Sequence, residues 1–223
     1  MDQPVKGRRP RRARGSLSRA QVVEAALGLA DERGVDSLSM PQLARRLDCG
    51  VMTIYSYVAD KDELLDAMVQ RGLADLHMLG PLPTHPAEVL IAWGRALRMT
   101  LLQHPSLPAI FLSRVVIDPA IIGGIERLLG ALARSGVQPA VGVHAIYAVL
   151  VYTVGFVAWE LPRTHRQPRQ AYADAWRHAL ASHVPADIPL TAGIADELPR
   201  IADLEQFELG LTALANGLPA TRT

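Results

Sequence analysis

Three helix-start signatures near the beginning of the chain constrain its fold most strongly. In each of them a serine or aspartate is followed three residues later by glutamine or glutamate: Ser18 with Gln21, Ser39 with Gln42, and Asp60 with Glu63. In such a capping box the first side chain accepts from a free backbone N–H of the helix start, and the second side chain reaches back to the first residue. Three boxes so close together predict a helical N-terminal region.

The segments after these boxes have the lengths and spacing of short helices. Apolar residues repeat at helical intervals after Ser18 until Gly34 supplies a left-handed stop. A second helix is predicted from Ser39 to Leu47, with Pro41 harmlessly in its first turn. The pattern then predicts a third helix over residues 51–58 and a fourth from residue 60 through 68.

The second and third predicted helices form the pattern of a helix-turn-helix. Asp48-Cys49-Gly50 breaks the chain between them, small Ala44 lies where they would cross, and Leu43, Leu47 and Ile54 would face inward. In a DNA-binding helix-turn-helix the second helix enters the major groove. The alternative is an ordinary helical hairpin whose tyrosines pack at its rim.

The second helix of the motif carries side chains that suit contact with bases. Thr53 and Ser56 can donate to or accept from base edges or phosphates. Val51 and Met52 can meet thymine methyl groups. We therefore expect these four residues to contact DNA.

Further side chains around this helix suit contact with the phosphate backbone. Tyr55 and Tyr57 would place phenol hydroxyls within reach of phosphate oxygens, and Lys61 would add a cation at the next helix start. Ser39 and Gln42, at the start of the preceding helix, complete the candidate DNA-binding residues of this domain.

Positive charge is concentrated at the N-terminus. Residues 1–19 hold 7 of the 23 lysines and arginines, whereas residues 20–223 hold 16 basic and 21 acidic side chains. We expect residues 1–17 to be a disordered arm that neutralises phosphates or lies in a minor groove; its candidate DNA-binding residues are Arg8, Arg9, Arg11, Arg12 and Arg14. Taken alone, such a run is as typical of a solubilising tail.

The stretch LSMPQLARRLDCGVMTIYSYVADKDELLDAM resembles the DNA-binding domain of the TetR (tetracycline-repressor) family of transcriptional regulators. The resemblance covers Ser18 to about Met68 and includes the triplet Thr53-Ile54-Tyr55. It implies an operator-binding dimer. This sequence has Asp48 at the family's usual turn glycine, Tyr57 at its usual histidine, and Pro41 where many members have a base-reading arginine. Asp48 still tolerates a left-handed conformation.

The second half of the chain reads as helices separated by proline or glycine, with no competing strand alternation. The five predicted segments cover residues 87–105, 119–136, 139–161, 169–183 and 204–218. With 49% hydrophobic residues, the chain can bury a substantial core. We predict an all-α fold: a basic arm over residues 1–17, a three-helix helix-turn-helix domain over 18–68, and a larger helical effector-binding and dimerisation domain over 69–223.

One helical stretch is unusually apolar. Residues 138–159 contain no Asp, Glu, Lys or Arg, and their length would suffice for a membrane span. The stretch also contains polar side chains such as His144 and Thr153, and two glycines, Gly142 and Gly155, that permit close helix contact. These residues favour a central helix that is buried on nearly all sides, in part against a second subunit. No membrane association is predicted, and the N-terminus lacks the apolar core of a secretory signal, which favours the cytoplasm.

The TetR resemblance implies that the second domain holds a ligand cavity and pairs its eighth and last helices with those of a second subunit. The candidate ligand-binding residues are large apolar or aromatic side chains, of which we expect fewer than about half to touch a ligand: Trp93, Leu97, Phe111, Tyr147, Val151, Phe156 and Trp159. The family's metal-coordinating histidine corresponds here to Ile110-Phe111-Leu112, so we expect no metal-chelated tetracycline, no metal site and no cofactor.

An enzyme is not predicted. The 7 histidines show no paired metal-ligand spacing, and neither a nucleophile elbow nor a phosphate-binding glycine loop is present. Cys49, the only cysteine, is more plausible as a packing residue than as a nucleophile. The sequence therefore predicts a homodimeric repressor that leaves a palindromic operator when a small apolar or aromatic effector binds. The alternative is an architectural, effector-independent DNA-binding dimer.

Overall fold

A computed structural model describes residues 17–74, 76, 80–114, 119–164 and 169–217. All regular structure in these ranges is helical, which confirms the predicted fold class. The chain divides into two compact units, residues 1–72 and residues 73–223.

The first unit begins with the predicted helix α1, Arg19–Arg33. Ser18 accepts from the Gln21 backbone at 3.2 Å, and the Ser18 backbone donates to Gln21 Oε1 at 2.9 Å, so both halves of the first capping box are present. Gly34 follows with φ 85° and ψ 152°, a positive-φ conformation that suits glycine but differs from the left-handed helical one that the sequence predicts. A short 3-10 turn, Val35–Ser37, leads to the next helix.

The second helix, α2 (Met40–Arg46), has only half of its predicted capping box. The Ser39 hydroxyl accepts from the Gln42 backbone at 3.4 Å, as expected. The reciprocal contact is not made, because Gln42 Oε1 is buried without a hydrogen-bond partner. The box prediction is therefore wrong for the Gln42 side chain.

The third helix, α3, covers Val51–Tyr55 and is three residues shorter than predicted. Ser56 caps it by donating from its hydroxyl to the Thr53 carbonyl at 2.7 Å, so residues 56–58 leave the helix. The fourth helix, α4, is Lys61–Leu73. Its Asp60 cap accepts from the Glu63 backbone at 2.8 Å, while the Glu63 carboxylate accepts from the Ala59 backbone at 2.6 Å.

The second unit contains every helix predicted for it, together with shorter elements that the sequence pattern did not indicate. The predicted helices are α5 (Pro86–Gln103), α7 (Pro119–Arg134), α8 (Pro139–Thr164), α9 (Arg169–Ala181) and α11 (Leu204–Asn216). The additional elements are α6 (Leu107–Ser113), α10 (Pro189–Gly193) and the 3-10 turns Pro185–Asp187 and Leu198–Ala202.

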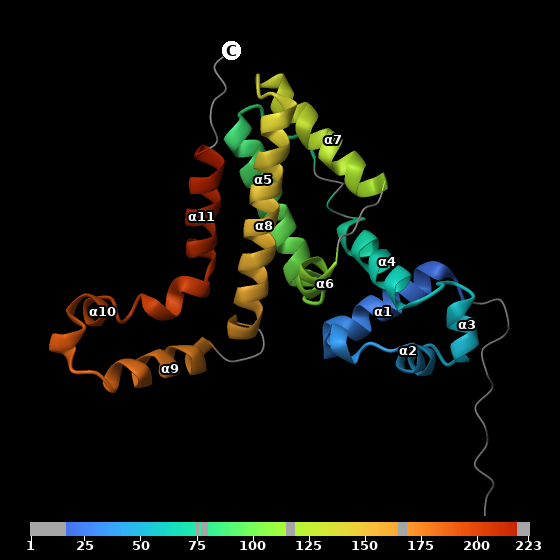
Figure 1. Ribbon diagram of the computed structural model, residues 1–223, viewed down its shortest axis with the longest axis horizontal. Helices are drawn as coiled ribbons and strands as arrows, with labels where there is room; N and C mark the ends of the chain where they lie inside the picture. The colour runs from blue at the N-terminus through green and yellow to red at the C-terminus, as the bar shows by residue number, and fades with distance from the viewer. Residues whose placement is uncertain (1–16, 75, 77–79, 115–118, 165–168, 218–223) are drawn as a thin grey trace, which may run out of the picture. The chain divides into compact units, whose positions relative to one another are not determined.

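Helix α8 is the centre of this unit and packs against α5, α6, α7 and α11 (Figure 1). It is long and apolar enough to cross a membrane by length and composition, with 39% of its most apolar window buried within the chain. The prediction of burial on nearly all sides included burial against a second subunit, so the single chain does not test it. Tyr147 is 50% exposed and Val151 is 68% exposed, so the part of the chain that the structure describes leaves one face of α8 uncovered.

Close helix contacts around α8 depend on glycine at particular positions. A Cβ added to Gly142 would lie 2.9 Å from a Leu129 methyl on α7, so Gly142 allows the predicted close approach. At Gly155 an added Cβ would meet nothing within 4 Å, so among the described residues of this chain no helix approaches closely there. On α11, Gly210 faces the Tyr152 hydroxyl, which donates to the Phe207 carbonyl at 3.0 Å.

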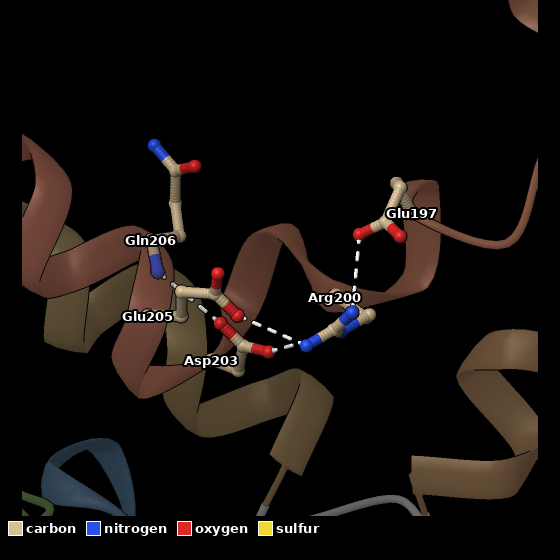
Figure 2. Close-up of polar contacts among 5 residues, drawn as sticks. All are labelled: Glu197, Arg200, Asp203, Glu205 and Gln206. Atoms are coloured by element: carbon tan, nitrogen blue, oxygen red, sulfur yellow. Dashed lines mark hydrogen bonds and ion pairs between the residues drawn. The ribbon is translucent and has the colours of Figure 1, made fainter. Parts of the chain in front are cut away.

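The start of α11 is organised by one arginine, shown in Figure 2. Arg200 contacts the carboxylates of Glu197 at 3.3 Å and Glu205 at 2.9 Å, and lies 3.8 Å from Asp203. Asp203 in turn accepts from the Gln206 backbone at 3.2 Å and caps the helix. Arg200 thus links the preceding 3-10 turn to the first turn of α11.

Candidate functional site

The turn between α2 and α3 places the third helix. Asp48 has φ 51°, the left-handed conformation predicted for the position where the TetR family usually has glycine. The Cys49 backbone N–H donates to the Ala44 carbonyl at 3.0 Å and closes the turn. Burial raises the pKa of the Cys49 thiol, which keeps it protonated and agrees with a packing role.

Helix α3 has a buried side and an exposed side. Ile54 has no exposed surface and packs in the unit where α2 contributes Leu43, which is also fully buried. On the other side Met52 is 79% exposed and Tyr55 is 44% exposed, and Thr53 is exposed beside them. A short helix thus presents an apolar side chain, a hydroxyl and a phenol together to the surrounding solvent.

The hydroxyls of Ser56 and Tyr57 are both used within the protein. Ser56 donates to the Thr53 carbonyl, as described above. The Tyr57 hydroxyl donates to the Leu17 carbonyl at 2.7 Å and so ties the turn after α3 to the residues before α1. The predicted phosphate contact of Tyr57 would require this proton to leave Leu17.

The other predicted DNA-binding residues lie near the starts of α2, α3 and α4 or outside the described residues. Ser39 is half-buried and caps α2, and Gln42 is half-buried beside it. Lys61 is exposed at the first position of α4, and Val51 is half-buried at the first position of α3. Arg8, Arg9, Arg11, Arg12 and Arg14 lie outside the described residues.

The second unit contains a cavity of about 520 Å³, which falls within the range of small-molecule sites. Four of the seven predicted ligand-binding residues line it: Trp93, Leu97, Phe111 and Tyr147. The remaining lining residues are Leu73, Leu76, Leu82, Arg114, Ile121, Gly123, Gly124, Ile125, Arg127, Leu128, Ile146 and Leu150. The cavity is therefore mainly aliphatic and aromatic, with two guanidinium groups.

The other three predicted residues, Val151, Phe156 and Trp159, line a separate depression together with Tyr152 of α8 and residues before and within α11. Phe156 also belongs to an aromatic cluster, with its ring centroid 5.3 Å from that of Phe207. The seven residues therefore do not form one site.

The sequence interpretation overlooked the contribution of α7 and of the arginines. Ile121, Gly124, Ile125 and Leu128 occupy positions i, i+3, i+4 and i+7 of α7, a helical stripe that was visible in the sequence. Arg114 directly follows α6, a helix too short for its periodicity to be recognised.

The described residues contain no group of three or more His, Cys, Asp or Glu side chains that could hold a metal ion. The two sites are thus an exposed short helix in one unit and an apolar cavity in the other. A helix-turn-helix with such a second helix, followed by a larger helical unit, places the protein among the helix-turn-helix transcriptional regulators.

Comparisons with known proteins identify the family. Residues 22–68 match the family described as bacterial regulatory proteins, tetR family, and residues 82–222 match the tetracyclin repressor-like C-terminal domain. The HTH-type transcriptional repressor Rv1353c of Mycobacterium tuberculosis is 31% identical over 95% of this chain and 84% of its own length. The HTH-type transcriptional repressor DrrR1 of Streptomyces coeruleorubidus is 32% identical over 95% of this chain and 81% of its own length.

Solved structures give the same result. ActR from Streptomyces coelicolor, solved without ligand and in complex with actinorhodin, superposes with a TM-score of 0.77 in both forms. It is 28% identical, and the match covers 92% of this chain and 96% of ActR. The chain belongs to the TetR family of bacterial transcriptional regulators, which confirms the resemblance seen in the sequence.

Proposed function

We propose that this protein is a cytoplasmic repressor that binds a palindromic operator as a homodimer and leaves it when a small molecule occupies the cavity of the second unit. The observation that carries the proposal is the exposed face of α3. Met52, Thr53 and Tyr55 face outward, while fully buried Ile54 fixes the helix from behind. A rigid support of this kind is what a base-reading helix requires.

Each exposed group of α3 has a partner on duplex DNA that suits its chemistry. Met52 and Val51 would pack on thymine methyl groups, and the Thr53 hydroxyl would bind a base edge or phosphate. Tyr55 would donate to a phosphate oxygen, and Lys61 at the start of α4 would add a positive charge beside it. The cap residues and the arginines of the N-terminal arm would supply further backbone contacts.

Two copies are needed because one short helix reads too few base pairs for a specific operator. The uncovered face of α8 supports a dimer: Val151 is 68% exposed, and Leu209 on neighbouring α11 is 65% exposed. Covering both residues with the same surface of a second chain would remove this apolar area from water.

The cavity supports control by a small molecule, and the ActR complex with actinorhodin is a precedent within the family. Leu73, the last residue of α4, and Leu76 beyond it both line the cavity. A ligand that displaces these two leucines would shift α4, which begins only a few residues after α3. Such a ligand must prefer the non-binding geometry by a few kcal/mol in order to shift the population.

A fluorescence-anisotropy titration tests the DNA-binding part of the proposal. The purified protein is titrated against DNA from immediately upstream of its own gene and against the same DNA scrambled, across a range of salt concentrations. We expect tight, sequence-dependent binding whose logarithmic dissociation constant rises steeply with salt. Equally weak binding to both DNAs at every salt concentration would contradict the repressor function.

The architectural alternative predicts a different response to small molecules. A structural DNA-binding dimer would keep its affinity when the cavity is filled, whereas a regulator would lose affinity. The size and apolar lining of the cavity favour the regulator.

A further inference from the structure

The turn after α3 is bonded to the chain at the point where the N-terminal arm joins α1. Leu17 is the last residue of the predicted arm, and its carbonyl accepts from the Tyr57 hydroxyl at 2.7 Å. Two residues further along, Arg19 Nη2 lies 3.0 Å from Glu63 Oε1. Residues 17–19 are thus joined by two contacts to the segment that runs from α3 into the first turn of α4.

The segment that makes these contacts is itself held in place. Val58 is buried, and its backbone N–H donates to the Ile54 carbonyl at 3.2 Å. The second carboxylate oxygen of Glu63 accepts from the Ala59 backbone at 2.6 Å. The arm therefore starts from a point whose position relative to α3 is fixed.

The bond to Leu17 decides what Tyr57 can do on DNA. A phenol has one O–H, so a tyrosine hydroxyl donates to one acceptor at a time. Phosphate oxygens of DNA only accept, and the Tyr57 proton is already donated to Leu17. While this bond is kept, Tyr57 does not fill the phosphate-binding role predicted from the sequence, and its hydroxyl acts on the arm instead.

The position of this anchor places the arm beside the DNA-reading face. Tyr57 follows Tyr55, the last residue of α3, by two positions, so Leu17 lies one tyrosine side chain away from the end of that helix. An extended chain spans about 3.3–3.6 Å per residue, so Arg14 can lie at most about 11 Å and Arg8 at most about 32 Å from Leu17. The arm arginines are thus confined to within roughly one turn of duplex, about 34 Å, from the edge of the bases that α3 would read.

Holding the root of the arm affects both the strength and the register of its binding. A tether that starts close to its target raises the effective concentration of the groups it carries, and this gain falls as the free length grows. Arginines bind preferentially in the narrow minor groove of A·T-rich DNA, where the potential is more negative. An anchored arm therefore meets the same flanking base pairs in every complex, whereas an unanchored arm samples many phosphates.

We propose that Tyr57 is a positioning residue whose bond to Leu17 directs the N-terminal arm into the minor groove that flanks each half-site. Sequence preference then extends to base pairs that α3 does not touch, and the preferred flank is rich in A·T pairs. This inference rests on the proposed DNA-binding function and assigns Tyr57 a role distinct from a phosphate contact. The arm residues through which Tyr57 acts lie outside the described residues: Arg8, Arg9, Arg11, Arg12 and Arg14.

A double-mutant cycle in the full-length protein tests this role. Tyr57→Phe removes the hydroxyl and keeps the ring, a second variant replaces the arm arginines named above with glutamine, and a third combines both changes. Each protein is titrated by fluorescence anisotropy against the palindrome selected from a random library, flanked either by A·T pairs or by G·C pairs. With the arm intact, Tyr57→Phe should weaken binding to the A·T-flanked duplex about five-fold, as expected for one hydrogen bond, and should reduce the preference for that flank. In the glutamine background the same change should alter the affinity by less than about two-fold.

Tyr55→Phe is the matched control, because it makes the same chemical change on α3 itself, at a residue that is 44% exposed. It should weaken binding about ten-fold whether or not the arm is charged, and leave the flank preference unchanged. Cleavage of the bound DNA by hydroxyl radicals, which attack from the minor groove, gives a second readout. The wild type should protect the flanks, whereas Tyr57→Phe and the glutamine variant should lose this protection and keep protection over the palindrome.

Equal weakening by Tyr57→Phe in both backgrounds would indicate a direct phosphate contact or a general defect, and would overturn the positioning role. The role is also refuted if Tyr57→Phe has no effect, or if the wild type shows neither flank preference nor flank protection. In each of these cases specific binding of the wild type to the palindrome survives, and with it the proposed function. Absence of that specific binding in the wild type would refute the proposed function, and the positioning role with it.

Discussion

The buried ion pair between α5 and α8 makes the sharpest prediction about stability. Arg98 donates to Glu160 through Nε at 3.2 Å and through Nη2 at 2.5 Å, and the two side chains are only 10% and 3% exposed. The Arg98 guanidinium also lies 5.1 Å from the ring centroid of Phe207 on α11. The pair therefore joins three helices around the middle of the second unit.

Replacing one partner leaves a charge buried without its counterpart. We expect Glu160→Ala to lower the free energy of unfolding by about 3–5 kcal/mol, the usual cost of breaking a buried pair. For a urea slope of about 2 kcal/mol per M, the midpoint should fall by roughly 1.5–2.5 M. The double replacement Arg98→Met with Glu160→Leu removes both charges and should be much less damaging than the single one.

Tryptophan fluorescence reports this transition selectively, because all 3 tryptophans, Trp93, Trp159 and Trp176, belong to the second unit. Protein concentration is held constant, since dimerisation would couple to unfolding. A midpoint shift below about 0.5 M for Glu160→Ala, or a double variant as unstable as the single one, would refute the assignment of a structural role to the ion pair.

Three further predictions concern the DNA-binding face and local packing. Tyr55→Phe should weaken operator binding about ten-fold in anisotropy titrations without changing the melting temperature, because it removes one donor to phosphate from a partly exposed side chain; unchanged affinity would exclude that contact. Gly210→Ala should cost about 1–3 kcal/mol in thermal unfolding, because the added methyl group meets the Tyr152 hydroxyl, and Tyr152→Leu in the same chain should recover part of the loss. The hydrogen bond from the Ala59 backbone N–H lowers the pKa of Glu63, so the ionised Glu63 stabilises the fold at neutral pH and this contribution is lost as the pH falls below about 4. The stability difference between wild type and Glu63→Gln should therefore shrink over that range. A constant difference would contradict the assignment.

The N-terminal helices could be predicted from the sequence because their starts depend on local contacts. The Ser18 capping box and the positive φ of Asp48 each involve residues that are adjacent or three apart. The end of α3 could not be located in the same way. Besides the local Ser56 cap, the turn after α3 is held by the bond from Tyr57 to Leu17, which joins residues 40 positions apart and leaves no mark on local periodicity.

The apolar and aromatic composition of the cavity could be predicted from the sequence, but the set of residues that line it could not. Tyr147 and Val151 are one helical turn apart on α8, yet Tyr147 lines the cavity and Val151 lines the other depression. The neighbouring helices decide this. Residues of α7 and the residue after α6 line the cavity together with Tyr147, whereas residues near the start of α11 line the depression together with Val151. Such neighbours are set by contacts between distant segments, which a single sequence does not reveal.

The central claim is that two copies of α3 read a specific palindrome, and selection of bound DNA from a random library tests it without any assumption about the regulated gene. The purified protein is used to enrich sequences through several rounds, which are then sequenced. The account predicts an inverted repeat whose half-sites are centred about one helical turn, or a multiple of it, apart. Enrichment of no motif, or of a single unrepeated half-site, would contradict the account.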